Sequence, residues 1–523
     1  MTVPKANISL RYDMSVPYGS GTPYSMSKLY RSGSYVTKAN TKGESGLIPS
    51  SGTISFSNFM GSTKYEYILE QNTAPGATVF CSSAAPQSGG SDIWVTGVNY
   101  ITRINQAGDI GMQANTFGYP VIGIDMDNQS PLCYYYFNNT EVIALASHRV
   151  ISTSQSSIVV TRYYSANTLI YDSNEITNST STKFHVPKVI SANTIPTTGS
   201  VFGTGNGELY IGAGYIQTTP SYTSHAGEMI PMIIRLNRTM TAIDWSKTFD
   251  LSQQHNLAVN AIKPDGLGNL YIALGVGGSA NINPPGSFLM KLNATTGAII
   301  WSVTISTALY LYDLGFNYNK TAIFVNGAKS IYKFDTSGNL VWAKEFNFNP
   351  GNYLFRRWGM DVSADRTGFV DDSIYFGGSL YLTTGSTPTD YVGFYCKIDT
   401  NGNMIWNRTI SSDNGAVDIS SIKRINNDDL ILVGNHFISI SNTTGIMLRL
   451  PSGNVGPTGV YSTANGSYTI SNASYTFTTI TPTITANTPG DYASAPSLLL
   501  NSFTTSRGSY GSTLISTVTD FNG

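Results

Sequence analysis

The sequence predicts an all-β protein built as a seven-bladed β-propeller, and three observations lead to this prediction. The composition is rich in Gly and Tyr, with 51 and 33 residues, and only 12% charged, which favours strands and turns over helices. A turn element that begins with a basic residue and leads into a strand recurs seven times, and its four clearest copies read basic–hydrophobic–Asp/Asn. A short apolar strand that closes on a small residue precedes each copy.

The turn element carries the clearest repeat. Four copies, such as "KLNATTGAIIW" and "KFDTSGNLVW", end in Trp, at Trp245, Trp301, Trp342 and Trp406. Weaker copies place Met112 and Tyr171 at the Trp position, and the copy at Arg449 has no aromatic residue there. Asp or Asn can open such a turn and Gly supplies a positive φ. We expect the four Trp to be structural residues buried between neighbouring blades.

The preceding strands, such as "GNLYIALG", are apolar on both faces, which is expected of an inner strand packed between neighbouring sheets. Roughly 40–70 residues per copy suits a four-stranded blade with variable loops. Closing the seven copies into a ring would remove exposed sheet edges. A β-sandwich or a β-helix with chance periodicity is the alternative.

Four regions are expected along the chain. Residues 1–62 form a small N-terminal β-module, residues 63–90 a linker into the first blade, and residues 91–470 the propeller. Residues 471–523 contain 21 Ser or Thr and alternate like strands. This β-rich tail could supply ring-closing strands or could pair with another subunit.

The N-terminal region contains a duplicated pattern. Residues 24–30, "YSMSKLY", match residues 54–60, "ISFSNFM", as alternating hydrophobic and Ser positions. Residues 1–62 hold six Lys or Arg against two acidic residues, a net charge of +4. We expect this region to dock on a partner, because a two-stranded unit of this size is marginal alone. The candidate docking residues are Met26, Leu29, Phe56, Phe59, Lys28 and Arg31.

The sequence indicates no catalytic, cofactor-binding or metal-binding residue. None of the five His lies within four residues of another His, and no phosphate-binding or nucleophile-elbow motif is present. Asp361 and Asp365 have the spacing of a calcium loop, but the later Glu is missing. The odd number of Cys, three, predicts buried thiols rather than disulfides. A net charge of −1 does not favour nucleic-acid binding, and neither a signal peptide nor a membrane span is expected.

Two resemblances bear on class. The repeat at Lys291–Trp301 is similar to the Asp-x-x-Thr-Gly-x-x-x-Trp pattern of quinoprotein-like propellers, in which that repeat docks blades. The words "PYSMSKLYRSGSYV" and "IPSSGTISFSNFMGS" resemble short N-terminal modules in virion structural proteins of tailed bacteriophages, especially tail-associated proteins.

The phage resemblance implies a non-enzymatic virion protein, made in the host cytoplasm and multimeric in the particle. It would dock on tail or baseplate subunits by its N-terminus and display a propeller that recognises a host-surface glycan or protein. The alternatives are a propeller enzyme, such as a hydrolase, lyase or quinoprotein, and a bacterial surface adhesin.

Overall fold

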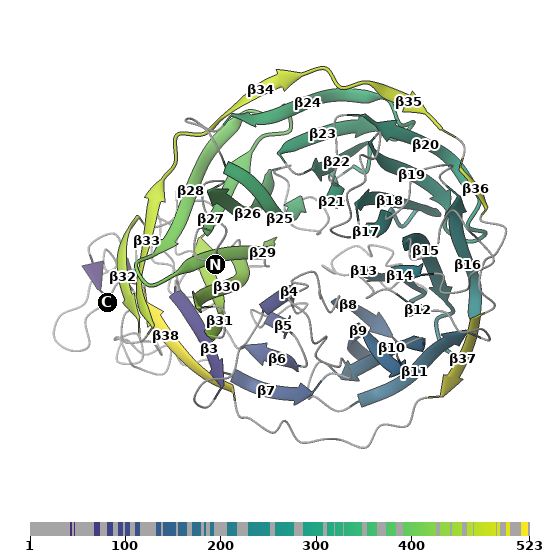
Figure 1. Ribbon diagram of the computed structural model, residues 1–523, viewed down its shortest axis with the longest axis horizontal. Helices are drawn as coiled ribbons and strands as arrows, with labels where there is room; N and C mark the ends of the chain where they lie inside the picture. The colour runs from purple at the N-terminus through teal and green to yellow at the C-terminus, as the bar shows by residue number, and fades with distance from the viewer. Residues whose placement is uncertain are drawn as a thin grey trace, which may run out of the picture.

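The computed structural model shows the chain as an all-β fold whose sheets follow one another around a ring (Figure 1). Of the first 206 residues it describes only the strands. Beyond these it describes residues 207–216, 229–250, 257–276, 286–306, 311–317, 319–327, 329–347, 353–362, 373–382, 391–424, 429–439, 442–451, 458–463, 465–487, 489–491, 498–502 and 514–520. Within the described residues there is no helix, and so none that could cross a membrane.

The described residues form seven larger antiparallel sheets, and sheets 1 to 6 are each built mainly from strands consecutive in the chain. Sheet 1 contains β4 (Cys81–Pro86), β5 (Ile93–Gly97), β6 (Tyr100–Ile104) and β7 (Ile110–Asn115). Sheet 2 contains β8 (Leu132–Phe137), β9 (Thr140–Ser152), β10 (Gln155–Tyr164) and β11 (Ile170–Asn178). Sheet 3 contains β12 (Lys183–Phe184), β13 (Val189–Ala192), β14 (Leu209–Ile216), β15 (Met229–Leu236) and β16 (Ile243–Asp250).

The next three sheets repeat the same four-stranded plan. Sheet 4 contains β17 (Leu257–Pro264), β18 (Asn269–Val276), β19 (Ser287–Asn293) and β20 (Ile299–Ile305). Sheet 5 contains β21 (Leu311–Phe316), β22 (Ala322–Gly327), β23 (Ser330–Asp335) and β24 (Leu340–Asn347). Sheet 6 contains β25 (Tyr353–Val362), β26 (Ile374–Leu382), β27 (Tyr391–Ile398) and β28 (Met404–Ser412). In these three sheets the first strand, β17, β21 or β25, lies nearest the centre of the ring (Figure 1).

Sheet 7 is completed by a strand from near the N-terminus. It contains β29 (Ala416–Arg424), β30 (Asp429–Ser439), β31 (Asn442–Pro451) and β3 (Tyr67–Thr73). Since β3 pairs with β31, the strand occupies the fourth position that β20 and β24 occupy in their own sheets. The expected linker, residues 63–90, therefore contains β3 and β4, which are integral strands. The Gly-, Ala- and Pro-rich composition of residues 63–90 is typical of a linker, so the sequence did not predict these strands. Pairing with β3 satisfies the backbone N–H and C=O groups at the outer edge of β31.

The C-terminal tail runs around the outside of the ring and adds a strand to the outer edge of six sheets (Figure 1). Its order along the chain is opposite to that of the sheets. The pairs are β33 (Gly466–Asn472) with β28, β34 (Thr476–Ile480) with β24, β35 (Ile484–Ala486) with β20, β36 (Gly490–Asp491) with β16, β37 (Leu498–Ser502) with β11, and β38 (Leu514–Asp520) with β3. We call β33–β38 the belt.

The belt strands pair with strands of the same chain. The belt also begins earlier than the expected boundary at residue 471. β32 (Gly459–Thr463) pairs with β33, and both precede or span that boundary. Within the belt, β38 is the strand that pairs with β3, and it therefore belongs to sheet 7.

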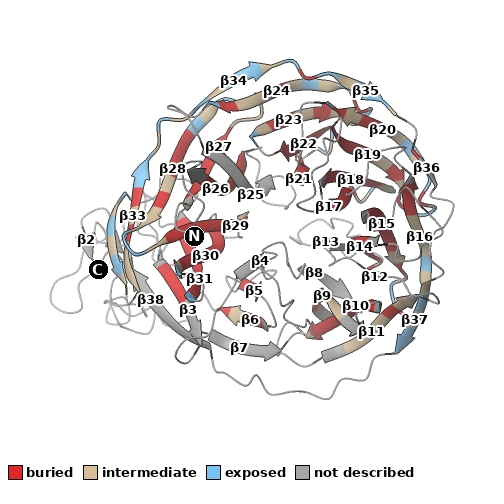
Figure 2. Ribbon diagram, in the orientation of Figure 1, coloured by how far each residue is buried: buried red, intermediate tan, exposed pale blue. Residues whose placement is uncertain are grey.

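Hydrophobic clusters fill the spaces between successive sheets from sheet 2 to sheet 7, and Figure 2 shows β18, β22 and β30 as largely buried. β18 shows how one strand serves two clusters. Leu270 and Ile272 pack towards sheet 3, while Tyr271 and Ala273 pack towards sheet 5. A strand buried on both faces in this way reads as a continuous apolar run.

Of the N-terminal region the structure describes two short strands. β1 (Lys42–Gly43) and β2 (Gly46–Leu47) form a separate two-stranded pair. All six candidate docking residues of the N-terminal region lie outside the described residues.

Candidate functional site: inter-sheet contacts and the closing seam

The Trp repeats place three side chains in one row across a sheet. In sheet 4, Tyr271 on β18 lies opposite Lys291 on β19, which lies opposite Trp301 on β20. The other rows are Tyr210–Arg235–Trp245, Phe324–Lys333–Trp342 and Tyr375–Lys397–Trp406. The sequence patterns did not mark the first aromatic residue of each row, which lies on β14, β18, β22 or β26. Its signal was the Tyr or Phe in "LYI", "IFV" and "IYF".

Within each row the ring of the inner strand contacts both of its neighbours. The ring centroids of Tyr271 and Trp301 lie 6.1 Å apart, and the Lys291 Nζ atom lies 5.4 Å from the Tyr271 centroid. The corresponding distances in sheet 5 are 6.1 Å for Phe324 and Trp342 and 5.5 Å for Lys333. These distances suit edge-on aromatic packing and a cation–π contact.

The same basic and Trp residues reach the next sheet. The Trp301 Nε1 and Lys291 Nζ atoms both donate to the carbonyl oxygen of Thr336, at 3.0 and 3.4 Å. Trp342 and Lys333 likewise donate to the Thr400 carbonyl, at 3.1 and 3.0 Å.

Sheet 3 uses Arg235, whose Nη1 donates to the Thr295 carbonyl at 2.9 Å. Each acceptor Thr lies two residues before the turn Gly, a regularity that is visible in the sequence.

The acceptor turns are held in shape by their own side chains. Asp335 Oδ1 accepts the backbone N–H groups of Ser337 and Asn339, each at 2.9 Å, and Oδ2 accepts the Asn339 amide at 2.8 Å. Burial would raise the pKa of this carboxyl, but these hydrogen bonds outweigh it and hold the pKa below its usual value. The predicted role of Asp and Asn as turn openers therefore agrees with the geometry.

Two weaker copies of the repeat have different outcomes. Met112 lies opposite Arg103, as expected for the Trp position. Tyr171 does not, because the register shift at Arg162 skips it and brings Asp172 opposite Arg162.

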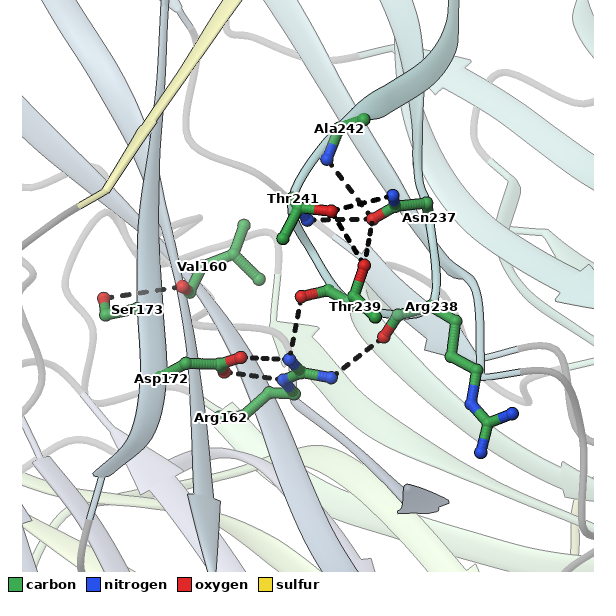
Figure 3. A network of polar contacts seen from close by, with 9 residues as sticks. All are labelled: Val160, Arg162, Asp172, Ser173, Asn237, Arg238, Thr239, Thr241 and Ala242. Carbon is green, nitrogen blue, oxygen red and sulfur yellow. Dashed lines mark hydrogen bonds and ion pairs between the residues drawn. The ribbon is translucent and has the colours of Figure 1, made fainter. Parts of the chain in front are cut away.

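The physical reason for the Asp is charge. Arg162 is buried, and a buried guanidinium needs a paired carboxylate. Asp172 pairs with Arg162 through Nε at 2.6 Å and through Nη2, and Arg162 also donates to the Arg238 and Thr239 carbonyls of sheet 3 (Figure 3).

The copy at Arg449 obtains its partner from the other end of the chain. Arg449 on β31 lies opposite Tyr67 on β3, the register position that Trp301 occupies opposite Lys291. An aromatic residue therefore stands at the position that seemed empty, and it precedes Arg449 by almost the whole ring in the sequence.

A buried polar network joins the two ends of the chain at this seam. Glu70 on β3, His436 on β30 and Tyr468 on β33 are all buried. The Tyr468 hydroxyl donates to Glu70 Oε1 at 2.7 Å and lies 2.8 Å from His436 Nδ1, and His436 Nε2 lies 3.0 Å from the Asn414 carbonyl oxygen. Tyr468 and Glu70 are 398 residues apart, so no local pattern could have paired them.

Two further donors complete the coordination of Glu70. The Thr463 hydroxyl donates to Oε1 at 2.9 Å, and the Asn465 amide donates to Oε2 at 3.1 Å. Burial lowers the pKa of His436, and burial together with the nearby Glu70 carboxylate raises the pKa of Tyr468. The network is therefore suited to holding β3, β30 and the tail together.

Two observations bear on metal binding and on thiol chemistry. Among the described residues, no three His, Cys, Asp or Glu side chains are grouped to hold a metal ion. Asp365 lies outside the described residues, and Asp361 lies on β25 opposite Tyr375 of β26. Cys396 is a buried free thiol, and burial raises its pKa well above the usual value.

No known family model matches the chain, and no curated protein matches its sequence. Solved structures share a loose likeness. A protein of unknown function from Bacteroides caccae is 10% identical, with 66% of this chain and 93% of that chain covered and a TM-score of 0.33. Quinohemoprotein alcohol dehydrogenase ADHIIG from Pseudomonas putida is 8% identical, with 75% and 78% covered and a TM-score of 0.36. The Neurospora crassa Pan2 WD40 domain is 8% identical, with 62% and 95% covered and a TM-score of 0.30.

Proposed function

We propose that the chain is a closed seven-bladed β-propeller that serves as a non-enzymatic structural component of a tailed-bacteriophage virion. The seven sheets are its blades, with β3 as the outer strand of the seventh. In support of closure, the inner strand β29 of sheet 7 contacts β4 of sheet 1, and β4 contacts β8 of sheet 2. The seam network of Glu70, Tyr468 and His436 then locks the last blade.

One observation carries the proposed role. The described strands of all seven sheets lie within residues 67–520, and both copies of the duplicated pattern precede them in the chain. An N-terminal segment with a net charge of +4 and alternating hydrophobic positions suits attachment to another protein. This supports docking by the N-terminus and display of the ring.

The partners would be tail or baseplate subunits of the particle, in which the chain is multimeric. The hydrophobic positions Met26, Leu29, Phe56 and Phe59 would be buried by that contact, and Lys28 and Arg31 would lie at its rim. The polar Tyr-, Ser- and Asn-rich loops of the ring suit recognition of a host-surface glycan or protein. The chain would be made in the host cytoplasm and reside in the virion.

The proposal is tested by removing residues 1–62, which leaves β3 intact. We expect the shortened protein to melt like the full chain and to be missing from assembled particles, as read by protein gel and cryo-microscopy. A point variant in the first copy, Leu29→Asp, should have the same effect, with Ser27→Asp as the matched control. Normal incorporation of the shortened protein would contradict N-terminal docking.

A further inference from the structure

Three consecutive sheets expose a large hydrophobic side chain at the same position. Ile300, Val341 and Ile405 are 51%, 55% and 53% exposed, and each immediately precedes the Trp of its sheet. We call these three residues the apolar row. They belong to sheets 4, 5 and 6, which are neighbours in the ring (Figure 1).

A shared β-bulge explains the exposure. In sheet 4, Lys291 pairs with Trp301 while Leu292 pairs with Ile299, so Ile300 is the extra, unpaired residue. The same shift leaves out Val341 in sheet 5 and Ile405 in sheet 6.

The bulge does not require a hydrophobic residue. In sheet 3 the corresponding position is Asp244, which lies 3.5 Å from the Arg235 guanidinium. The fold of the sheets therefore does not require a hydrophobic residue at this position. Its repetition on three successive sheets makes this end of the ring a candidate contact surface.

The chain leaves the ring at the same end of the sheets. Tyr67 on β3 takes the register position of Trp301 and Trp406, so β3 begins where β20 and β28 begin. Ile68 and Trp406, the residue after Ile405, belong to one hydrophobic cluster between sheets 6 and 7. The strand β3 therefore begins at the end of the sheets that carries the apolar row.

The segment close enough to cover the row is the second copy of the duplicated pattern. Met60 precedes Tyr67 by seven residues, a reach of up to roughly 25 Å for an extended chain. Ile54, Phe56 and Phe59 supply hydrophobic side chains, and Ser alternates with them. This segment needs burial that its own hairpin cannot provide, and the row offers apolar surface at the end of the sheets where β3 begins.

We propose that residues 54–60 pack on the apolar row of their own chain. The first copy, residues 24–30, is then the part that extends to another protein. Met26 and Leu29 keep the proposed partner contact, whereas Phe56 and Phe59 contact the ring instead. This inference refines the proposed docking role. Only its statement about the first copy, residues 24–30, rests on that role. It also accounts for the duplication, since one copy anchors the N-terminal region to the ring and the other copy attaches the ring.

Hydrogen exchange of the purified protein, read by mass spectrometry, tests the contact without any particle. We expect the amides of residues 54–60 to be protected, and Val341→Asp combined with Ile405→Asp to accelerate their exchange about tenfold or more. Leu499→Asp is the matched control, because Leu499 is 49% exposed but lies on the belt strand β37. The control should leave the exchange unchanged.

Either of two results would overturn the proposal: no protection of residues 54–60 in the unaltered protein, or protection that survives the double substitution. The milder pair Val341→Ser and Ile405→Ser provides a second reading if the Asp variants unfold. Since exchange is measured on the isolated chain, its outcome is independent of particle incorporation. A protected segment with normal incorporation of the shortened protein would contradict only virion docking.

Discussion

Trp301 donates its indole N–H to the backbone carbonyl oxygen of Thr336 at 3.0 Å, and the two residues belong to neighbouring sheets. The same carbonyl also receives the Lys291 ammonium. A single turn of sheet 5 is thus tied to two side chains of sheet 4. Trp342 and Thr400 repeat this contact between sheets 5 and 6. The two contacts therefore hold sheet 5 against both of its neighbours.

Trp301→Phe should destabilise the protein more than Trp245→Phe. Both substitutions shrink a ring that packs on a turn Gly, but the Trp245 indole nitrogen has no hydrogen-bond partner among the described residues. The difference in unfolding free energy should be about 0.5–1.5 kcal/mol, the usual net value of one hydrogen bond. Chemical unfolding of both variants checks this, and equal losses would remove the indole bond from the account of sheet docking.

Gly338→Ala should cost more stability than Gly268→Ala. Both glycines have a positive φ, +87° and +95°, so Ala is strained at either position by about 1 kcal/mol. A Cβ at Gly338 would also lie 3.0 Å from Trp301, whereas a Cβ at Gly268 would meet nothing within 4 Å. Thermal unfolding of the pair separates backbone strain from crowding, and a larger loss at Gly268 would contradict the packing of the turn on the indole.

Acidification should weaken the seam through His436. Burial lowers its folded-state pKa below the unfolded value of about 6.5, so the unfolded chain binds more protons there. The associated stability is complete above that pH and is lost as the pH falls below it. We expect the unfolding free energy to decline from pH 7.5 to pH 5 less steeply in His436→Gln than in the unaltered protein. Parallel declines would show that the other His residues and the carboxylates account for the slope.

Removing the belt strands β34–β38 should cause the protein to associate. Deleting residues 474–523 leaves β33 and Tyr468 in place but exposes the outer edges of β24, β20, β16 and β11. Unpaired strand edges template contacts with other chains. Size-exclusion chromatography with light scattering should show higher-order species. A shorter deletion that begins after Asn487 retains β34 and β35 and should associate less. A fully monomeric 474–523 deletion would mean that the belt does not protect the edges.

Local chemistry could be predicted from the sequence where neighbours in the chain are neighbours in space. The turns at Asp335 and Asp399, the inner apolar strands and the repeat that ends in Trp all depend on contacts within one hairpin. The sequence patterns therefore predicted the all-β class and the repeated sheet. The periodicity at Trp301 and Trp342 also correctly marked residues that reach the adjacent sheet.

Only the tertiary structure decided the contacts between distant segments. A one-residue register shift put Asp172, rather than Tyr171, opposite Arg162, because the buried guanidinium requires a carboxylate. The hidden strand β3 at the N-terminal end filled the gap opposite Arg449, and the tail formed a belt on strands of its own chain. Backbone pairing of this kind satisfies N–H and C=O groups almost independently of side-chain identity, so composition alone could not tell which edge each strand would join.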